Sequence, residues 1–248
     1  MNPLTPVHLG FTAGDVAVVT GAASGIGRAT AVRAAQQGLS VAAWDINQSG
    51  LDATIEQIGD LVPTVGILAD TSDRVDVERA LAASAELGTL RHLANVAGPP
   101  ATADLTFDEA ILKSLGSMRL MVDRWLAPGA PDGATLVNVA SVAGNVVGTN
   151  SDWYCAAKAG IVGYTRHLAA YRTAEVRANA VGPGMVDTPR LGGFAASDVG
   201  QRVLQRIPLH RMAEPDEIAW VILFLLSPLA SYINGAFVPV DGGWTVTQ

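Results

Sequence analysis

Apolar residues recur along this chain in two alternating patterns, as short unbroken runs and as longer amphipathic stretches. The short runs are typical of strands that are buried on both faces, whereas the longer stretches have the spacing of helices. In chain order, the predicted strands are 16–20, 39–44, 65–68, 90–95, 135–139, 177–181 and 236–240. The predicted helices are 28–37, 51–58, 75–87, 107–126, 152–171, 200–206 and 214–226, and a loop-rich region is expected over 182–199.

This regular alternation of strand and helix predicts the fold class. It favours an α/β protein with a single-domain, Rossmann-type, doubly wound parallel sheet and helices on both faces. No internal repeat or low-complexity linker interrupts the alternation. Residues 14–248 are therefore expected to form one domain, preceded by a loose N-terminal lead-in over residues 1–13, which Pro and Gly punctuate.

The composition excludes several classes of protein. Of the 248 residues, 49% are hydrophobic and 16% are charged, which is ample for a large core. The net charge is −7 and no basic block stands out, so neither nucleic acid nor a membrane is expected as a partner. One cysteine, Cys155, and four scattered histidines predict no disulfide within the chain and no metal site. With no visible signal sequence and no apolar run long enough to span a bilayer, a cytoplasmic location is expected.

Three glycines follow the first predicted strand, in the pattern Gly21-x-x-x-Gly25-x-Gly27. Glycines at a strand-to-helix turn let the backbone approach a pyrophosphate closely at the positive end of a helix. A tight turn that needs glycine only for its conformation is the alternative. The position between a strand and a helix favours a dinucleotide site.

Asp45 ends the second predicted strand. A carboxylate there can accept hydrogen bonds from both hydroxyls of an adenosine ribose, and it would repel a 2′-phosphate. NAD(H) is therefore the preferred cofactor, although Arg28 and Arg33 on the first helix leave NADP(H) open. The alternative role for Asp45 is to cap the turn at the strand end.

Tyr154 and Lys158 are four residues apart in a predicted helix, so they project from one face. A nearby ammonium is expected to lower the phenol pKa from about 10, which would let the tyrosine exchange a proton near neutral pH. This spacing also arises by chance on solvated helices, so the pair gains its meaning from the motifs around it.

Taken together, these motifs resemble the short-chain dehydrogenase/reductase family from about Asp15 to Trp244. The resemblance lies in segments that follow the family's order: 20–27, Asp70-Thr71, 95–98, Ser141, the Tyr154/Lys158 pair, 179–184, Thr188-Pro189 and 240–243. It implies one dinucleotide-binding and catalytic domain that assembles as a homotetramer or a homodimer.

The resemblance also assigns roles to residues. Tyr154 would exchange the proton with the substrate, Ser141 would hold the substrate oxygen, and Lys158 would also bind the nicotinamide ribose. Ser114 stands where the family usually has a catalytic asparagine. The implied cofactor-binding residues are Gly21, Ser24, Gly25, Ile26, Gly27, Asp45, Ile46, Asp70, Thr71, Asn95, Ala97, Gly98, Tyr154, Lys158, Pro183, Gly184, Val186 and Thr188.

The predicted substrate pocket is mostly apolar and contains no Arg or Lys, which favours a neutral, hydrophobic ketone or secondary alcohol as the small-molecule substrate. Two alternatives stay open, a 3-oxoacyl-thioester reductase that uses NADPH and a non-catalytic dinucleotide-binding protein on the same fold. The predicted pocket residues are Ala143, Val146, Val147, Trp153, Met185, Leu191 and Phe194.

Overall fold

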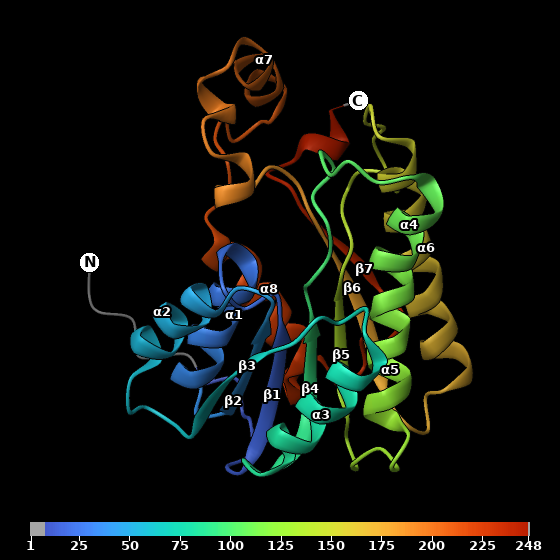
Figure 1. Cartoon of the computed structure of the whole chain (residues 1–248). Helices are drawn as coiled ribbons and strands as arrows, with labels where there is room; N and C mark the ends of the chain where they lie inside the picture. The colour runs from blue at the N-terminus through green and yellow to red at the C-terminus, as the bar shows by residue number, and fades with distance from the viewer. Residues whose placement is uncertain (1–7, 248) are drawn as a thin grey trace.

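The structure is a computed structural model that describes residues 8–247, and it has three layers (Figure 1). A parallel sheet lies in the middle, with the strand order β3-β2-β1-β4-β5-β6-β7. This order confirms the predicted doubly wound α/β fold. The strands are β1 Asp15–Thr20, β2 Ser40–Asp45, β3 Thr64–Leu68, β4 Thr89–Asn95, β5 Thr135–Val139, β6 Arg177–Pro183 and β7 Phe237–Val240.

Helices cover both faces of the sheet (Figure 1). One layer consists of α1 Gly25–Gln36, α2 Gln48–Ile58 and α8 Pro215–Leu226. The other consists of α3 Arg74–Ala85, α4 Phe107–Ile111, α5 Ser117–Leu126 and α6 Asp152–Tyr171. Helix α7, Asp198–Arg206, stands apart from both layers, beyond the carboxyl ends of the strands (Figure 1).

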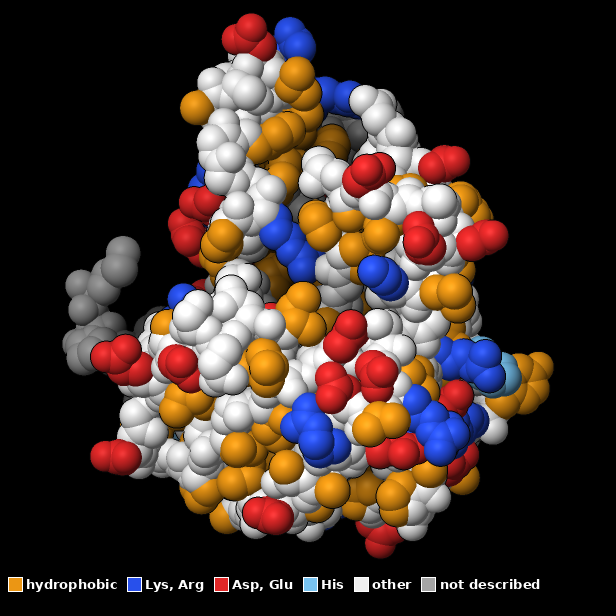
Figure 2. Space-filling model, viewed as in Figure 1, with side chains coloured by type: hydrophobic (Ala, Val, Ile, Leu, Met, Phe, Trp, Pro, Cys, Tyr) orange, Lys and Arg blue, Asp and Glu red, His pale blue; other side chains and the backbone are white. Residues whose placement is uncertain are grey.

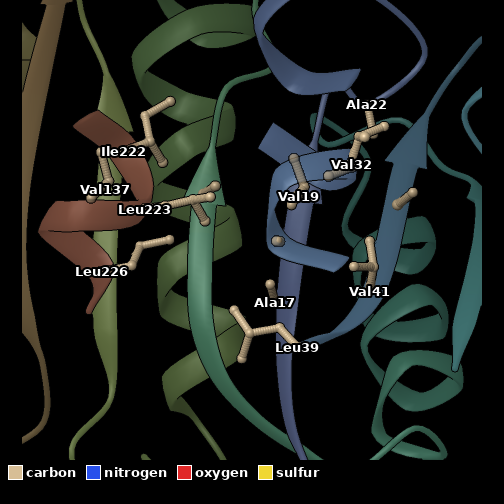
Figure 3. Close-up of a cluster of buried hydrophobic side chains, with 14 of the residues drawn as sticks. Ala17, Val19, Ala22, Val32, Leu39, Val41, Val137, Ile222, Leu223 and Leu226 are labelled. Carbon is tan, nitrogen blue, oxygen red and sulfur yellow. The ribbon is translucent and has the colours of Figure 1, made fainter. Parts of the chain in front are cut away.

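The central strand β1 is buried along its whole length. Ala17 and Val19 pack into the layer of α1 and α8, whereas Val16 and Val18 face the other layer. Figure 3 shows Ala17 and Val19 in the same cluster as Leu223 of α8. Burying a Val or Leu side chain contributes about 1.5–3 kcal/mol, so these runs hold the strand ends, and the groups at those ends, in place.

Two predicted helices differ from the structure in ways that matter for the site. Helix α1 begins at Gly25 and not at residue 28, so the glycine turn is itself the first turn of the helix. The predicted helix 107–126 is interrupted by a π-helical turn, Leu112–Gly116, between α4 and α5. A π turn holds one more residue than an α turn and shifts the side chains after it around the helix axis.

The region predicted as loop, 182–199, contains the end of β6 and two short 3-10 helices, Pro189–Leu191 and Phe194–Ala196. Its last two residues begin α7.

The part of the predicted lead-in that the structure describes, residues 8–13, has no helix or strand. Leu9 is nevertheless buried, and its N–H donates to Gln37 Oε1 at 2.9 Å. The Phe11 ring meets His92 edge-on, with 5.0 Å between the ring centroids. The rest of the predicted lead-in, 1–7, lies outside the described residues. Within 8–247, no helix has the length and apolar character needed to cross a bilayer.

Candidate active site

A cleft of about 690 Å³ opens at the carboxyl ends of the strands, where the strand order reverses between β1 and β4. This switch point is where doubly wound sheets bind ligands, because the loops on its two sides leave in opposite directions. Figure 2 shows the hollow beneath the segment that carries α7. The cleft is lined by the glycine turn, by the ends of β2 to β6, by the start of α6 and by the segment after β6.

The glycine turn has no room for side chains. A Cβ on Gly27 would lie 2.0 Å from the Gly21 carbonyl oxygen, and one on Gly25 would lie 2.9 Å from Thr188 Cγ2. Gly21 and Gly25 also have positive φ angles of 70° and 52°, a region that favours glycine.

The start of helix α1 is open to a ligand. The side chain of its N-cap residue, Ser24, makes no capping hydrogen bond, and the first turn contains no acidic residue. The free N–H groups and the helix dipole therefore favour an anion at this point. A dinucleotide pyrophosphate fits this combination of close backbone and open helix end.

Asp45 lies beside this turn and has a structural role there. Its Oδ2 accepts the Ala23 N–H and its Oδ1 accepts the Asn47 N–H, both at 3.0 Å. The carboxylate thus supports the glycine turn, which is the alternative role that the sequence left open. It also lines the cleft, together with Ile46 and Asp70.

Ser141, Tyr154 and Lys158 meet at the other end of the cleft. Lys158 is buried, its Nζ donates to the Val139 carbonyl at 3.0 Å, and Nζ lies 5.6 Å from the Tyr154 ring centroid. Asn145 links the two segments, since its Nδ2 donates to the carbonyls of Ser141, at 2.9 Å, and Lys158, at 3.2 Å. The helix that carries the tyrosine is thereby fixed against the strand end that carries the serine.

Burial has the largest effect on the pKa values of both Tyr154 and Lys158. It raises the pKa of the Tyr154 phenol above its ordinary value, and hydrogen bonding to Ser141 and the positive charge of Arg190 only partly oppose this rise. Burial likewise lowers the pKa of Lys158 to about 7, with a further contribution from Arg190. The predicted lowering of the phenol pKa is therefore wrong for the protein without ligand, because desolvation outweighs the nearby charges.

The structure brings nearly all the sequence-predicted cofactor residues to the lining of the cleft. The exception is Asn95, which is buried behind it: Thr20 Oγ1 donates to its Oδ1 at 3.3 Å, and its Nδ2 donates to the Met118 carbonyl at 3.2 Å. Asn95 thus ties together the ends of β1 and β4 and the start of α5. The predicted residues that do line the cleft are Gly21, Ser24, Gly25, Ile26, Gly27, Asp45, Ile46, Asp70, Thr71, Ala97, Gly98, Tyr154, Lys158, Pro183, Gly184, Val186 and Thr188.

Ser114 does not line the cleft, so the structure gives no support to its predicted catalytic role. It is buried within the π-helical turn, and its carbonyl accepts the Ser117 hydroxyl at 2.9 Å. The preceding residue, Lys113, lines the cleft instead.

The predicted substrate pocket is only partly assembled. Ala143, Met185 and Leu191 line the cleft, whereas Val146, Val147, Trp153 and Phe194 do not. Trp153 precedes Tyr154 on α6 and so points roughly 100° away around the helix, into a buried position. Val147 pairs with Ala143 in a short bridge that folds this loop back on itself.

Two cations that sequence reasoning missed line the cleft, Lys113 and Arg190. The residues predicted for the substrate pocket include neither of them. Arg190 Nη2 donates to the Gly98 carbonyl at 2.7 Å, across 92 residues of sequence. One signal was available, because Arg190 directly follows the Thr188-Pro189 pair that the family pattern contains.

Comparison with known proteins agrees with this site. A family model described as enoyl-(acyl carrier protein) reductase matches residues 21–245. The chain is 38% identical to cis-4-hydroxycyclohexanecarboxylate dehydrogenase of Sinomonas cyclohexanicum, over 93% of this chain and 96% of the relative. It is 34% identical to cyclohexanol dehydrogenase of Acinetobacter sp. strain SE19, over 93% of this chain and 94% of the relative.

A solved structure gives the same result. The crystal structure of levodione reductase matches with a TM-score of 0.86 and 32% identity, over 96% of this chain and all of the other. The chain is therefore a member of the short-chain dehydrogenase/reductase family, an enzyme that binds a nicotinamide dinucleotide and acts on a CH–OH group.

Proposed function

We propose that this enzyme interconverts a secondary alcohol and a ketone with NAD(H), using Tyr154 as the general acid and base. The observation that carries the proposal is that Ser141, Tyr154 and Lys158 share one cleft with the glycine turn. The relatives named for cyclohexanol and for a hydroxycyclohexanecarboxylate support a ring-shaped alcohol. Ala143, Met185 and Leu191 offer that ring an apolar wall.

Ser141, Tyr154 and Lys158 have different roles in the proposed proton transfer. Ser141 donates a hydrogen bond to the substrate oxygen, and Tyr154 gives up its proton in reduction or accepts one in oxidation. The raised pKa of Tyr154 keeps the phenol protonated at neutral pH, ready for reduction. Lys158, with a pKa of about 7, can gain or lose a proton at neutral pH and so restore the proton of the phenol. When bound, the nicotinamide carries the hydride and, in its oxidised form, a positive charge.

The surroundings of Asp45 support NAD(H) as the cofactor. The two arginines on the first helix, Arg28 and Arg33, which the sequence left open as partners of a 2′-phosphate, do not line the cleft. Arg28 donates to Gly50 O at 3.2 Å and to Thr54 Oγ1 at 3.0 Å, and Arg33 pairs with Asp216 on α8. The Asp45 carboxylate lines the cleft where the adenosine ribose would lie, and its negative charge repels the extra phosphate of NADP(H).

The test is a titration of NADH and NADPH against the purified protein, followed by oxidation of cyclohexanol. We expect NADH to bind about tenfold or more tightly than NADPH, because only NADPH brings a phosphate near the carboxylate of Asp45. A preference for NADPH would contradict the cofactor proposal and favour the acyl-thioester reductase. Binding of neither nucleotide would contradict the assignment of the glycine turn.

We also propose that the enzyme acts as a homotetramer or a homodimer in the cytoplasm. Large apolar side chains stand exposed on α6 and next to α8, among them Tyr171, Leu229 and the fully exposed Tyr232. Such side chains are typical of surfaces that become buried on assembly. Light scattering of the purified protein tests the assembly, and a monomeric mass would contradict it.

A further inference from the structure

We infer that Arg190 recognises a carboxylate on the substrate, so that the preferred substrate is a ring-shaped secondary alcohol with one carboxylate away from its hydroxyl. The inference rests on the proposed alcohol–ketone interconversion and names the substrate class for the same site. It replaces the sequence-based expectation of a neutral substrate with an anionic one.

The first observation is the position of Arg190. It lies in the 3-10 helix Pro189–Leu191 and lines the cleft that contains Tyr154. The hydrogen bond from Nη2 to the Gly98 carbonyl holds the guanidinium between the segment after β6 and the loop after β4. Among the described residues this is the only hydrogen bond of the Arg190 side chain, so most of its five N–H donors are free.

The second observation is that Arg190 has no carboxylate partner among the described residues. Some other arginines of the chain do have one, as in the pairs Arg91–Asp15 at 2.8 Å and Arg211–Glu217 at 2.6 Å. Of the arginines without an ion pair among the described residues, Arg190 is the one that lines this cleft. A guanidinium that lines a cleft and has no carboxylate partner there favours an anionic ligand, and its planar fork matches the two oxygens of a carboxylate.

The third observation is the distribution of charge along the cleft. The acidic residues that line it, Asp45 and Asp70, are at the adenosine end, after β2 and β3. The substrate end has Arg190 and Lys113 and no carboxylate. Figure 2 shows Lys and Arg side chains beside the hollow. The charge of Arg190 also lowers the pKa values of both Tyr154 and Lys158, so it is near enough to act on the reacting groups.

The apolar wall defines the rest of the ligand. Met185 and Leu191 flank Arg190 in sequence, and Ala143 follows Ser141 closely. A ligand that fits this end of the cleft would place its hydroxyl at Tyr154, a saturated ring against these apolar side chains and a carboxylate at Arg190. The cofactor pyrophosphate is the other anion within the cleft, so the experiment must separate the two.

The test measures ligand binding to the full-length protein saturated with NADH, using calorimetry. The probes are cyclohexanecarboxylate and cyclohexanecarboxamide, which have the same shape and differ in charge, and neither has a hydroxyl to oxidise. We expect the wild type to bind the carboxylate about tenfold to a hundredfold more tightly than the amide. Arg190→Gln should abolish this difference, and Arg190→Lys should restore part of it, because lysine keeps the charge but not the fork.

Two controls accompany the binding test. Arg202→Gln removes an exposed arginine of α7 that does not line the cleft, and it should leave both affinities unchanged. The affinity for NADH should stay within about twofold in Arg190→Gln, since the inference assigns the guanidinium to the substrate. Equal binding of the two probes by the wild type would overturn the inference. So would a loss of NADH affinity in Arg190→Gln greater than its loss of carboxylate affinity.

A second arm measures turnover of 4-hydroxycyclohexanecarboxylate and cyclohexanol with NAD⁺. Arg190→Gln should raise KM for the carboxylate substrate about tenfold to a hundredfold and leave KM for cyclohexanol nearly unchanged. An equal rise in KM for both alcohols would count against the inference. If the wild type bound the carboxylate probe selectively but oxidised neither alcohol, the proposed function would fail while the role of Arg190 would stand.

Discussion

Buried ionisable groups lie at both ends of the strands, and they differ in their partners. The side of the sheet where the strands begin is called the amino edge, and the side where they end is called the carboxyl edge. At the amino edge, a cavity of about 590 Å³ is lined by Asp15, Arg91, His92, Thr135 and Arg177, among others. Arg91 pairs with Asp15, and the Arg177 guanidinium donates to four backbone carbonyls. Both arginines therefore form interactions within the folded chain that stabilise the structure.

At the carboxyl edge, the cations lack such partners. Lys158 and Arg190 each donate to one backbone carbonyl, and neither forms an ion pair with a described residue. The pKa values of Lys158 and His92 are both lowered by burial, to about 7 and about 4. A lowered pKa therefore does not by itself distinguish a catalytic group from a structural one.

This comparison predicts that changes at the carboxyl edge alter reaction rates and ligand choice, and that changes at the amino edge alter stability. The largest effect should follow from Tyr154→Phe, which removes the phenol proton. We expect kcat to fall about 100- to 10,000-fold while NADH affinity stays nearly constant.

Tyr164→Phe is the matched control for that variant. Tyr164 lies on the same helix and its hydroxyl is buried without a hydrogen-bond partner, but it does not line the cleft. Steady-state kinetics and NADH titration of both variants make the measurement. Retention of turnover by Tyr154→Phe would contradict the proposed mechanism.

Asp45→Asn tests the adenosine end of the same edge. Loss of the carboxylate charge should reduce the preference for NADH over NADPH about tenfold to a hundredfold, because the repulsion of the 2′-phosphate disappears. The measurement is the ratio of the two dissociation constants. Asp52→Asn, an exposed acidic residue on α2 outside the cleft, should leave this ratio unchanged. An equal change in both variants would mean that only net charge matters.

His92 tests the amino edge through the dependence of stability on pH. The Thr135 hydroxyl donates its proton to the Leu226 carbonyl at 3.0 Å, so His92 Nδ1, 2.7 Å from the Thr135 oxygen, must be the donor to it. The other nitrogen, Nε2, has no hydrogen-bond partner and lies 3.6 Å from Asp15 Oδ2. Burial, with help from Arg91 and Arg177 and against the opposing effect of Asp15, lowers the pKa of His92 to about 4.

Because this folded-state pKa is below the unfolded value of about 6.5, the unfolded chain binds the proton first as the pH falls. The stability contributed by neutral His92 is thus present above pH 6.5 and is lost on acidification toward pH 4. We expect a loss of about 2 kcal/mol between pH 7 and about pH 4.5. Urea unfolding of the wild type and of His92→Asn measures it, since asparagine keeps the Nδ1-like donor and does not titrate. Parallel pH curves for the two proteins would refute this account.

Much of the fold followed from local patterns. The buried runs of Val16–Val19 and the helical spacing around Tyr154 are properties of neighbouring residues, so the sequence shows them directly. The π turn at Leu112–Gly116 did not follow, because an extra residue in one turn leaves the helical pattern on either side intact. Within this turn Lys113, and not Ser114, lines the cleft.

In the candidate active site, too, some features were predicted from the sequence and others were not. The glycine turn and the Tyr154/Lys158 pair were predicted from spacing, because the residues of each motif are near in sequence, and Ser141 was predicted from the resemblance to the family. The direction of the Tyr154 pKa shift and the entry of Arg190 into the cleft were not predicted. Both depend on groups that only folding brings together, as the bond between Arg190 and Gly98 shows.

The sequence by itself determined the order of strands and helices and the residues proposed for the dinucleotide site and for proton transfer, because short-range periodicity and motif order encode them. Only the tertiary structure decided how the pKa values of buried groups shift and which cations line the cleft, because desolvation and long-range charge depend on the full set of neighbours in space.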